Sequence, residues 1–129
     1  MIAINLSGIQ STNPTKLSLE REQDVIVKHI EKWDDNELAL GVHDEQGNLI
    51  GWIPKLETIE KYGKEAAAEG NQVRVERERT RWLDTSFIRD NITTDMYRNN
   101  LEVRGKICRL QEDYESGDII SVSVMFDYM

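Results

Sequence analysis

The chain has 129 residues, with 16 Lys or Arg against 24 Asp or Glu, so its formal net charge is −8. This length suits one domain that buries a core without metal or disulfide help, and the single cysteine, Cys108, excludes an internal disulfide. The acidity excludes a protein that coats nucleic acid by bulk positive charge. No apolar run approaches the ~18 residues of a transmembrane helix. Asn5 and Ser7 interrupt the first apolar stretch, which argues against a signal peptide, so we expect a cytoplasmic location.

Alternation of apolar and polar residues dominates the first part of the chain and predicts four short strands. A Gly-Asn pair at 47–48 separates the third strand from the fourth, and this is typical of a hairpin turn because both residues tolerate positive φ. Pro54 ends the fourth strand, since it has no N–H to donate. The four predicted strands cover residues 2–7, 24–30, 38–42 and 49–53.

Beyond these strands the apolar spacing becomes helical. Leu56, Ile59 and Tyr62 recur at intervals of three residues, and Gly70 stands where a helix C-cap is expected. The spacing therefore predicts one helix near residues 55–69.

The last part of the chain is predicted to return to strands. Residues 72–82 alternate and predict a fifth strand, whereas residues 84–100 show no clean period and predict a long loop or a short helical turn. A closing hairpin is predicted with arms at 101–107 and 120–128 and its turn within 111–118. With about seven strands and one helix, the chain is predicted to be mainly β, folded as a small antiparallel barrel whose closure removes exposed strand edges.

Three motifs lie in the segment from residue 24 to residue 55, directly before the predicted helix. They are Asn-Glu-Leu-Ala-Leu-Gly-Val at 36–42, Gln-Gly-Asn at 46–48 and Ile-Gly-Trp-Ile-Pro-Lys at 50–55. With these motifs the segment resembles the HIRAN domain family. Clear similarity covers residues 1–70, and the resemblance implies a single HIRAN-like domain over residues 1–129.

The resemblance implies an OB-like or SH3-like β-barrel that binds single-stranded DNA or DNA ends. Lys55 matches a family position that reaches a phosphate, and Trp52 matches the aromatic position beside it. Asn36 lies in the end-binding motif and can hydrogen-bond a hydroxyl. Gln10 and Ser11 replace the basic residue and the Tyr of the family's end pocket, so the resemblance implies weakened recognition of the 3′ end.

Aromatic and basic residues supply the other binding candidates. Trp33, Trp52 and Trp82 offer indole faces on which any base can stack, although core packing is the competing interpretation, most strongly for Trp52 in its apolar hairpin. On the predicted strand 72–82, three arginines project from one side as a stripe that suits phosphates. The competing interpretation is a solvated strand whose arginines pair with glutamates across the sheet. The three residues of this stripe are Arg77, Arg79 and Arg81.

We expect no enzyme, because the sequence contains no nucleophile elbow, Walker sequence or phosphate-cradling glycine loop. A carboxylate-based nuclease site is the alternative left open, since two acids and a lysine brought together in space leave no fixed spacing. The acidic residues between positions 31 and 45 match no calcium loop and are typical of solvated turns. Two histidines are too few for a zinc site. We therefore expect no metal and no cofactor.

Two functions remain open at this stage. The first is a non-catalytic module that binds single-stranded DNA or DNA ends. The second is an acidic protein-interaction or regulatory domain that has lost DNA binding, for which the net charge of −8 and the replaced pocket residues argue. The first requires a nucleic-acid partner and the second a protein partner.

Overall fold

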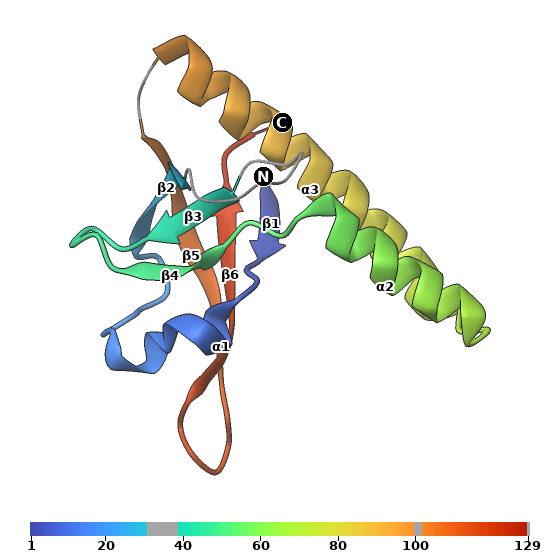
Figure 1. Ribbon diagram of the computed structural model, residues 1–129. Helices are drawn as coiled ribbons and strands as arrows, with labels where there is room; N and C mark the ends of the chain where they lie inside the picture. The colour runs from blue at the N-terminus through green and yellow to red at the C-terminus, as the bar shows by residue number, and fades with distance from the viewer. Residues whose placement is uncertain (31–38, 100–101, 129) are drawn as a thin grey trace.

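The computed structural model describes residues 1–30, 39–99 and 102–128 (Figure 1). Within these residues it contains six strands, three α-helices and one short 3₁₀ turn. In chain order they are β1 (Ile2–Asn5), α1 (Ile9–Thr12), the 3₁₀ turn (Pro14–Lys16), β2 (Asp24–Ile30), β3 (Ala39–His43), β4 (Leu49–Trp52), α2 (Leu56–Ala68), α3 (Gln72–Asn99), β5 (Val103–Glu112) and β6 (Ile119–Phe126).

The strands form one antiparallel sheet in the order β1-β6-β5-β2-β3-β4, which curls into a half-barrel (Figure 1). The two outer strands meet at one point. Ser7, just beyond β1, and Trp52, at the end of β4, exchange two backbone hydrogen bonds of 2.9 Å. The prediction of a mainly β, barrel-like fold is confirmed in this form, but the described residues contain six strands where about seven were predicted and three α-helices where one was predicted.

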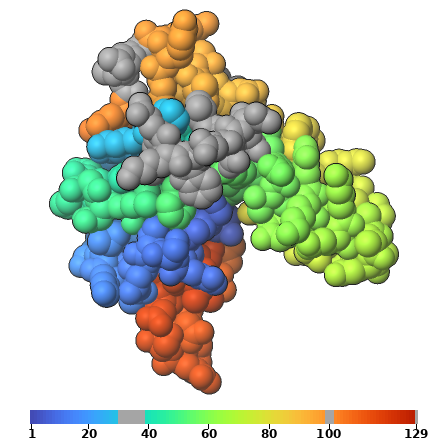
Figure 2. All heavy atoms as spheres, in the orientation of Figure 1, coloured from blue at the N-terminus to red at the C-terminus, as the bar shows by residue number. Residues whose placement is uncertain are grey.

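The core lies on the concave side of the sheet. Alternate residues of β6, namely Val122, Val124 and Phe126, are fully or almost fully buried, as strand geometry requires for one covered face. Ile88 and Ile92 of α3 belong to the same buried cluster. The second half of α3 therefore packs on the sheet, whereas α2 and the first half of α3 project from it (Figures 1 and 2).

Most local predictions agree with the structure. The four early strands, the helix near 55–69 and the closing hairpin are confirmed, with boundaries shifted by a few residues. Gly47 adopts a φ of 88° in the turn between β3 and β4, and Gly70 a φ of 69° after α2. Asp44 supports the first of these turns, because its carboxylate accepts hydrogen bonds from the backbone N–H groups of Gln46 and Asn48.

The predictions for residues 72–82 and 84–100 are wrong, because residues 72–99 form the single helix α3 and residue 100 lies outside the described residues. In residues 76–81 the alternation involves only charged and polar side chains, so it marks no apolar strand face. The face buried further along α3 consists of Thr85, Ile88, Arg89 and Ile92 at helical spacing. Two of these four residues are polar, and this is why the apolar period was hidden in the sequence.

The end of the chain is held to α3 by Tyr128, whose hydroxyl donates to the Asp95 carboxylate at 2.5 Å. Burial and this carboxylate raise the pKa of Tyr128. When the pKa of a phenol is higher in the folded than in the unfolded state, the group stabilises the fold at pH values below its unfolded pKa. This stability is lost as the pH rises toward the folded pKa. We expect wild-type stability to fall above about pH 10 and the Tyr128→Phe variant to lack this part of the decline.

Thermal unfolding of both proteins from about pH 8 to about pH 11 measures this difference. Tyr114→Phe is the matched control, because Tyr114 is fully exposed and its replacement leaves the Tyr128 contribution in place. Parallel pH profiles for wild type and Tyr128→Phe would contradict the expectation.

Candidate nucleic-acid interface

A hollow of about 580 Å³ lies where the first helix, the end of β4 and the two long helices meet. Residues 6–11 around α1 line one side, and residues 52–55 after β4 line another. The helices contribute Thr58 and Tyr62 from α2 and Arg81 from α3. We call this the basic hollow, for the charges described below.

Two glycines allow the chain segments around the basic hollow to cross closely. Gly8 has a φ of 72°, and a Cβ atom there would overlap the six-membered ring of the Trp52 indole. A Cβ atom at Gly51 would lie 2.9 Å from the carbonyl oxygen of Ser7. Only glycine fits both places without movement of the backbone or of the ring, so these residues set the position of Trp52.

The environment of Trp52 agrees with both interpretations made from the sequence, core packing and an accessible face for base stacking. Its ring packs against the Gly8 backbone, and the residue is nevertheless only half-buried and lines the basic hollow. An indole fixed on one side and accessible on another is a rigid platform for a flat ligand group.

The charge of the basic hollow is opposite in sign to that of the whole chain. Among the described residues that line it, the ionisable side chains are those of Lys55, Tyr62 and Arg81, and none is acidic. Arg81 also forms an ion pair of 3.4 Å with Glu78. Arg81 stays partly exposed in this pair, whereas the Glu78 side chain is only 12 % exposed. The hollow therefore suits a negatively charged group.

The positive surface continues along α3. Arg77 lies four residues before Arg81 and hence on the same side of the helix. Both arginines line an adjoining hollow of about 450 Å³, which also includes Asn5 and Asp84. Arg81 thus belongs to both hollows and connects them.

The predicted stripe of three arginines does not exist. In a helix, two residues separated by two positions differ by about 200° around the axis, so Arg79 faces away from Arg77 and Arg81. Arg79 instead forms an ion pair of 3.8 Å with Glu76. Trp82 also lies on that opposite side, and its Nε1–H donates to Glu60 of α2 at 3.2 Å.

The structure thus brings together some predicted site residues and separates others. Lys55, Trp52 and Arg81 meet in the basic hollow, and Arg77 lies beside it, whereas Arg79 and Trp82 lie elsewhere. The other two predicted residues, Trp33 and Asn36, lie outside the described residues.

Two lining residues of α2 were missed as site residues. Tyr62, whose exposed fraction is 38 %, was assigned to the apolar face of the helix, and Thr58 was not considered. The signal was present in the spacing, because Thr58 and Tyr62 lie four residues apart and therefore share one side of α2, directly after Lys55.

The remaining polar groups of the described residues do not form a metal site. Among the residues that the structure describes, no group of three or more His, Cys, Asp or Glu is arranged to hold a metal ion. Burial and nearby Lys28 lower the pKa of His43, and burial raises the pKa of the Cys108 thiol.

Within the residues that the structure describes, no helix combines the length and apolarity needed to cross a membrane.

Comparisons with protein-family models, curated proteins and solved structures find no match for this chain. The resemblance to the HIRAN domain thus stays a prediction from the residues that carry it.

Proposed function

We propose that this chain is a HIRAN-like domain of the OB-like or SH3-like barrel type that binds single-stranded DNA or DNA ends without catalysis. One observation carries the proposal: in an acidic protein, Lys55, Arg81 and a half-exposed Trp52 line one hollow that has no acidic residue among its described lining. Lys55 and Arg81 would each contact a phosphate, and Trp52 would stack one base, a contact worth ~1–3 kcal/mol.

The net charge of −8 does not exclude such binding. At physiological ionic strength the Debye length is about 8 Å, so acidic groups on distant surfaces repel the ligand weakly. Among the described residues that line the basic hollow, the charged ones are Lys55 and Arg81.

We expect Lys55→Ala and Arg81→Ala each to weaken binding of a short single-stranded oligonucleotide about tenfold. This follows from the loss of one charge-assisted hydrogen bond of about 1.5 kcal/mol. Each variant should also reduce the slope of log affinity against log salt by about 0.7, because one fewer phosphate is neutralised. Fluorescence anisotropy of a labelled oligonucleotide, titrated at several salt concentrations, measures both effects.

Arg79→Ala is the matched control, since it removes the same charge from the same helix on the side facing away from the hollow. It should leave affinity and salt slope unchanged. An equal loss in Arg79→Ala, or no wild-type binding at tens of micromolar in low salt, would refute the proposal. Because Gln10 and Ser11 line the hollow, oligonucleotides with a 3′ phosphate and with a 3′ hydroxyl should bind about equally.

A second candidate function is that of an acidic protein-interaction or regulatory domain. The observation that favours it is an apolar groove on the projecting helices, away from the basic hollow. The anisotropy titration separates the two candidates, because a domain that has lost nucleic-acid binding shows no change of anisotropy.

A further inference from the structure

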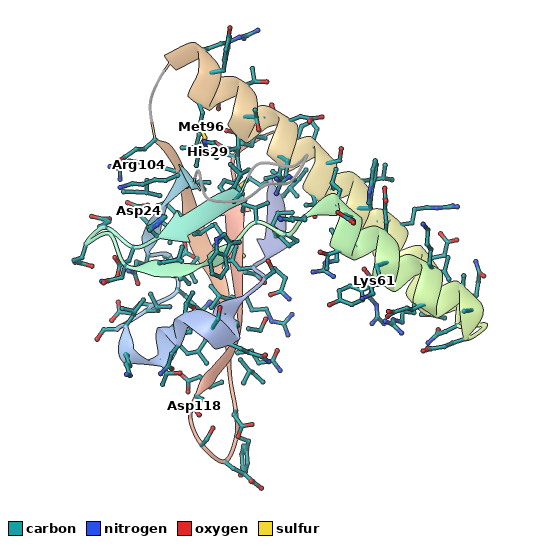
Figure 3. All side chains as sticks on the ribbon, viewed as in Figure 1. Asp24, His29, Lys61, Met96, Arg104 and Asp118 are labelled. Atoms are coloured by element: carbon teal, nitrogen blue, oxygen red, sulfur yellow. The ribbon has the colours of Figure 1, made fainter. Side chains whose placement is uncertain are left out.

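Helix α2 and the first half of α3, residues 56–84, form a helical hairpin that projects from the sheet (Figures 1 and 2). Figure 3 shows its side chains, Lys61 among them, extending well away from the half-barrel. An apolar groove of about 360 Å³ runs between the two helices. Its apolar lining consists of Ile59, Gly63 and Ala67 from α2 and Val75, Trp82 and Leu83 from α3.

The apolar groove exposes side chains that a monomer gains nothing by exposing. Leu83, which lines the groove, is 58 % exposed. An apolar groove with an exposed leucine on a projecting element indicates an interaction surface.

Gly63 keeps the floor of the apolar groove low. A Cβ atom there would meet the Cβ of Glu78 at 3.8 Å, an ordinary van der Waals contact, so the packing of α2 on α3 does not require glycine. Glycine nevertheless costs about 1 kcal/mol relative to alanine inside a helix. The same face therefore carries a protruding side chain, Leu83, and beside it a recess that can accommodate such a side chain.

The apolar groove is separate from the basic hollow. Thr58 and Tyr62 of α2 line the hollow, whereas Gly63 and Ala67 line the groove. On α3 the same division separates Arg81 from Val75, Trp82 and Leu83. The two features therefore lie on different sides of the helical hairpin, and an occupant of the groove leaves the hollow accessible.

The charge distribution favours a second copy of this chain as the occupant of the apolar groove. The helical hairpin contains six Lys or Arg and seven Asp or Glu, so it is nearly neutral, while the rest of the chain carries almost all of the acidic excess. The charged residues beside the groove are balanced as well, with Glu60 and Glu78 against Lys64 and Arg79. A second copy of this chain can thus approach along this face with little repulsion, whereas the acidic remainder of the chain would repel a second copy elsewhere.

We infer that the apolar groove is the interface of a symmetric homodimer, in which two helical hairpins pack into a four-helix bundle. Leu83 of each copy would enter the recess at Gly63 and Ala67 of the other. The half-barrels would remain at the two ends, because each hairpin stands away from its own sheet (Figure 1).

Sedimentation velocity of the full chain, from about 1 to about 200 µM, tests this inference across the usual range of dimer affinities. We expect the wild type to be a dimer at the upper concentrations. Leu83→Glu should weaken dimerisation about 30-fold or more, as expected for a charge placed at the centre of an interface. Circular dichroism should show unchanged helix content, because Leu83 is mostly exposed in the single chain.

Tyr97→Glu is the control, because Tyr97 is 91 % exposed on the same helix but lies outside the apolar groove. It should dimerise as the wild type does. A wild-type monomer at about 200 µM would overturn the inference and leave the groove to another protein's helix or without an occupant. Dimerisation that survives Leu83→Glu, or that Tyr97→Glu abolishes equally, would also overturn it.

Discussion

Replacement of Arg89 by methionine is expected to lower the free energy of unfolding by about 3 kcal/mol. Arg89 is 7 % exposed, and its Nη1 donates to the carbonyl oxygens of Ile53 at 3.3 Å and Pro54 at 3.1 Å. Methionine has a similar length but no donor, so two buried carbonyl groups would lose this partner. Each such loss costs about 1–3 kcal/mol.

The consequence reaches the basic hollow, because Ile53 and Pro54 directly precede Lys55 and line the hollow themselves. Urea unfolding followed by circular dichroism measures the loss of stability. Arg98→Met is the control: Arg98 is exposed in the last turn of α3, and a change within about 0.5 kcal/mol is expected there. A loss below about 1 kcal/mol for Arg89→Met would show that these hydrogen bonds contribute little.

Gly8→Ala is expected to destabilise the fold by about 2–3 kcal/mol and to displace the indole of Trp52. Two costs add at this position. The φ of 72° is unfavourable for alanine, and the new Cβ would overlap the Trp52 ring. Since Trp52 lines the basic hollow, oligonucleotide affinity should fall together with stability.

Gly117→Ala separates the two costs. Gly117 has nearly the same φ, 73°, but a Cβ atom there has nothing within 4 Å. Gly117→Ala should lower the free energy of unfolding by about 1 kcal/mol, the cost of the unfavourable φ alone. Urea unfolding gives both stabilities, and near-ultraviolet circular dichroism reports the tryptophan environment. Equal losses in the two variants, with an unchanged tryptophan signal in Gly8→Ala, would contradict the role assigned to Gly8.

Several parts of this protein could be predicted from local sequence alone. The early strands, the helix near 55–69 and the closing hairpin are marked by apolar period and by turn residues such as Gly47 and Gly70, whose positive φ values are observed. These signals act over a few residues and depend only on backbone geometry. The family resemblance predicted Lys55 and Trp52 as site residues, and the structure places them in one hollow.

Helix α3 and the grouping of the arginines depended on the tertiary structure. Arg89 is buried because carbonyl groups distant in sequence, at the end of β4, accept its hydrogen bonds, and no local pattern reveals such partners. Once 72–99 is helical, the 100° step per residue sends Arg77 and Arg81 to one side and Arg79 to the other. Local sequence thus determined the early strands, α2 and the closing hairpin. Packing between distant segments determined α3 and which side chains meet, because burial of a polar group depends on partners that only the folded chain supplies.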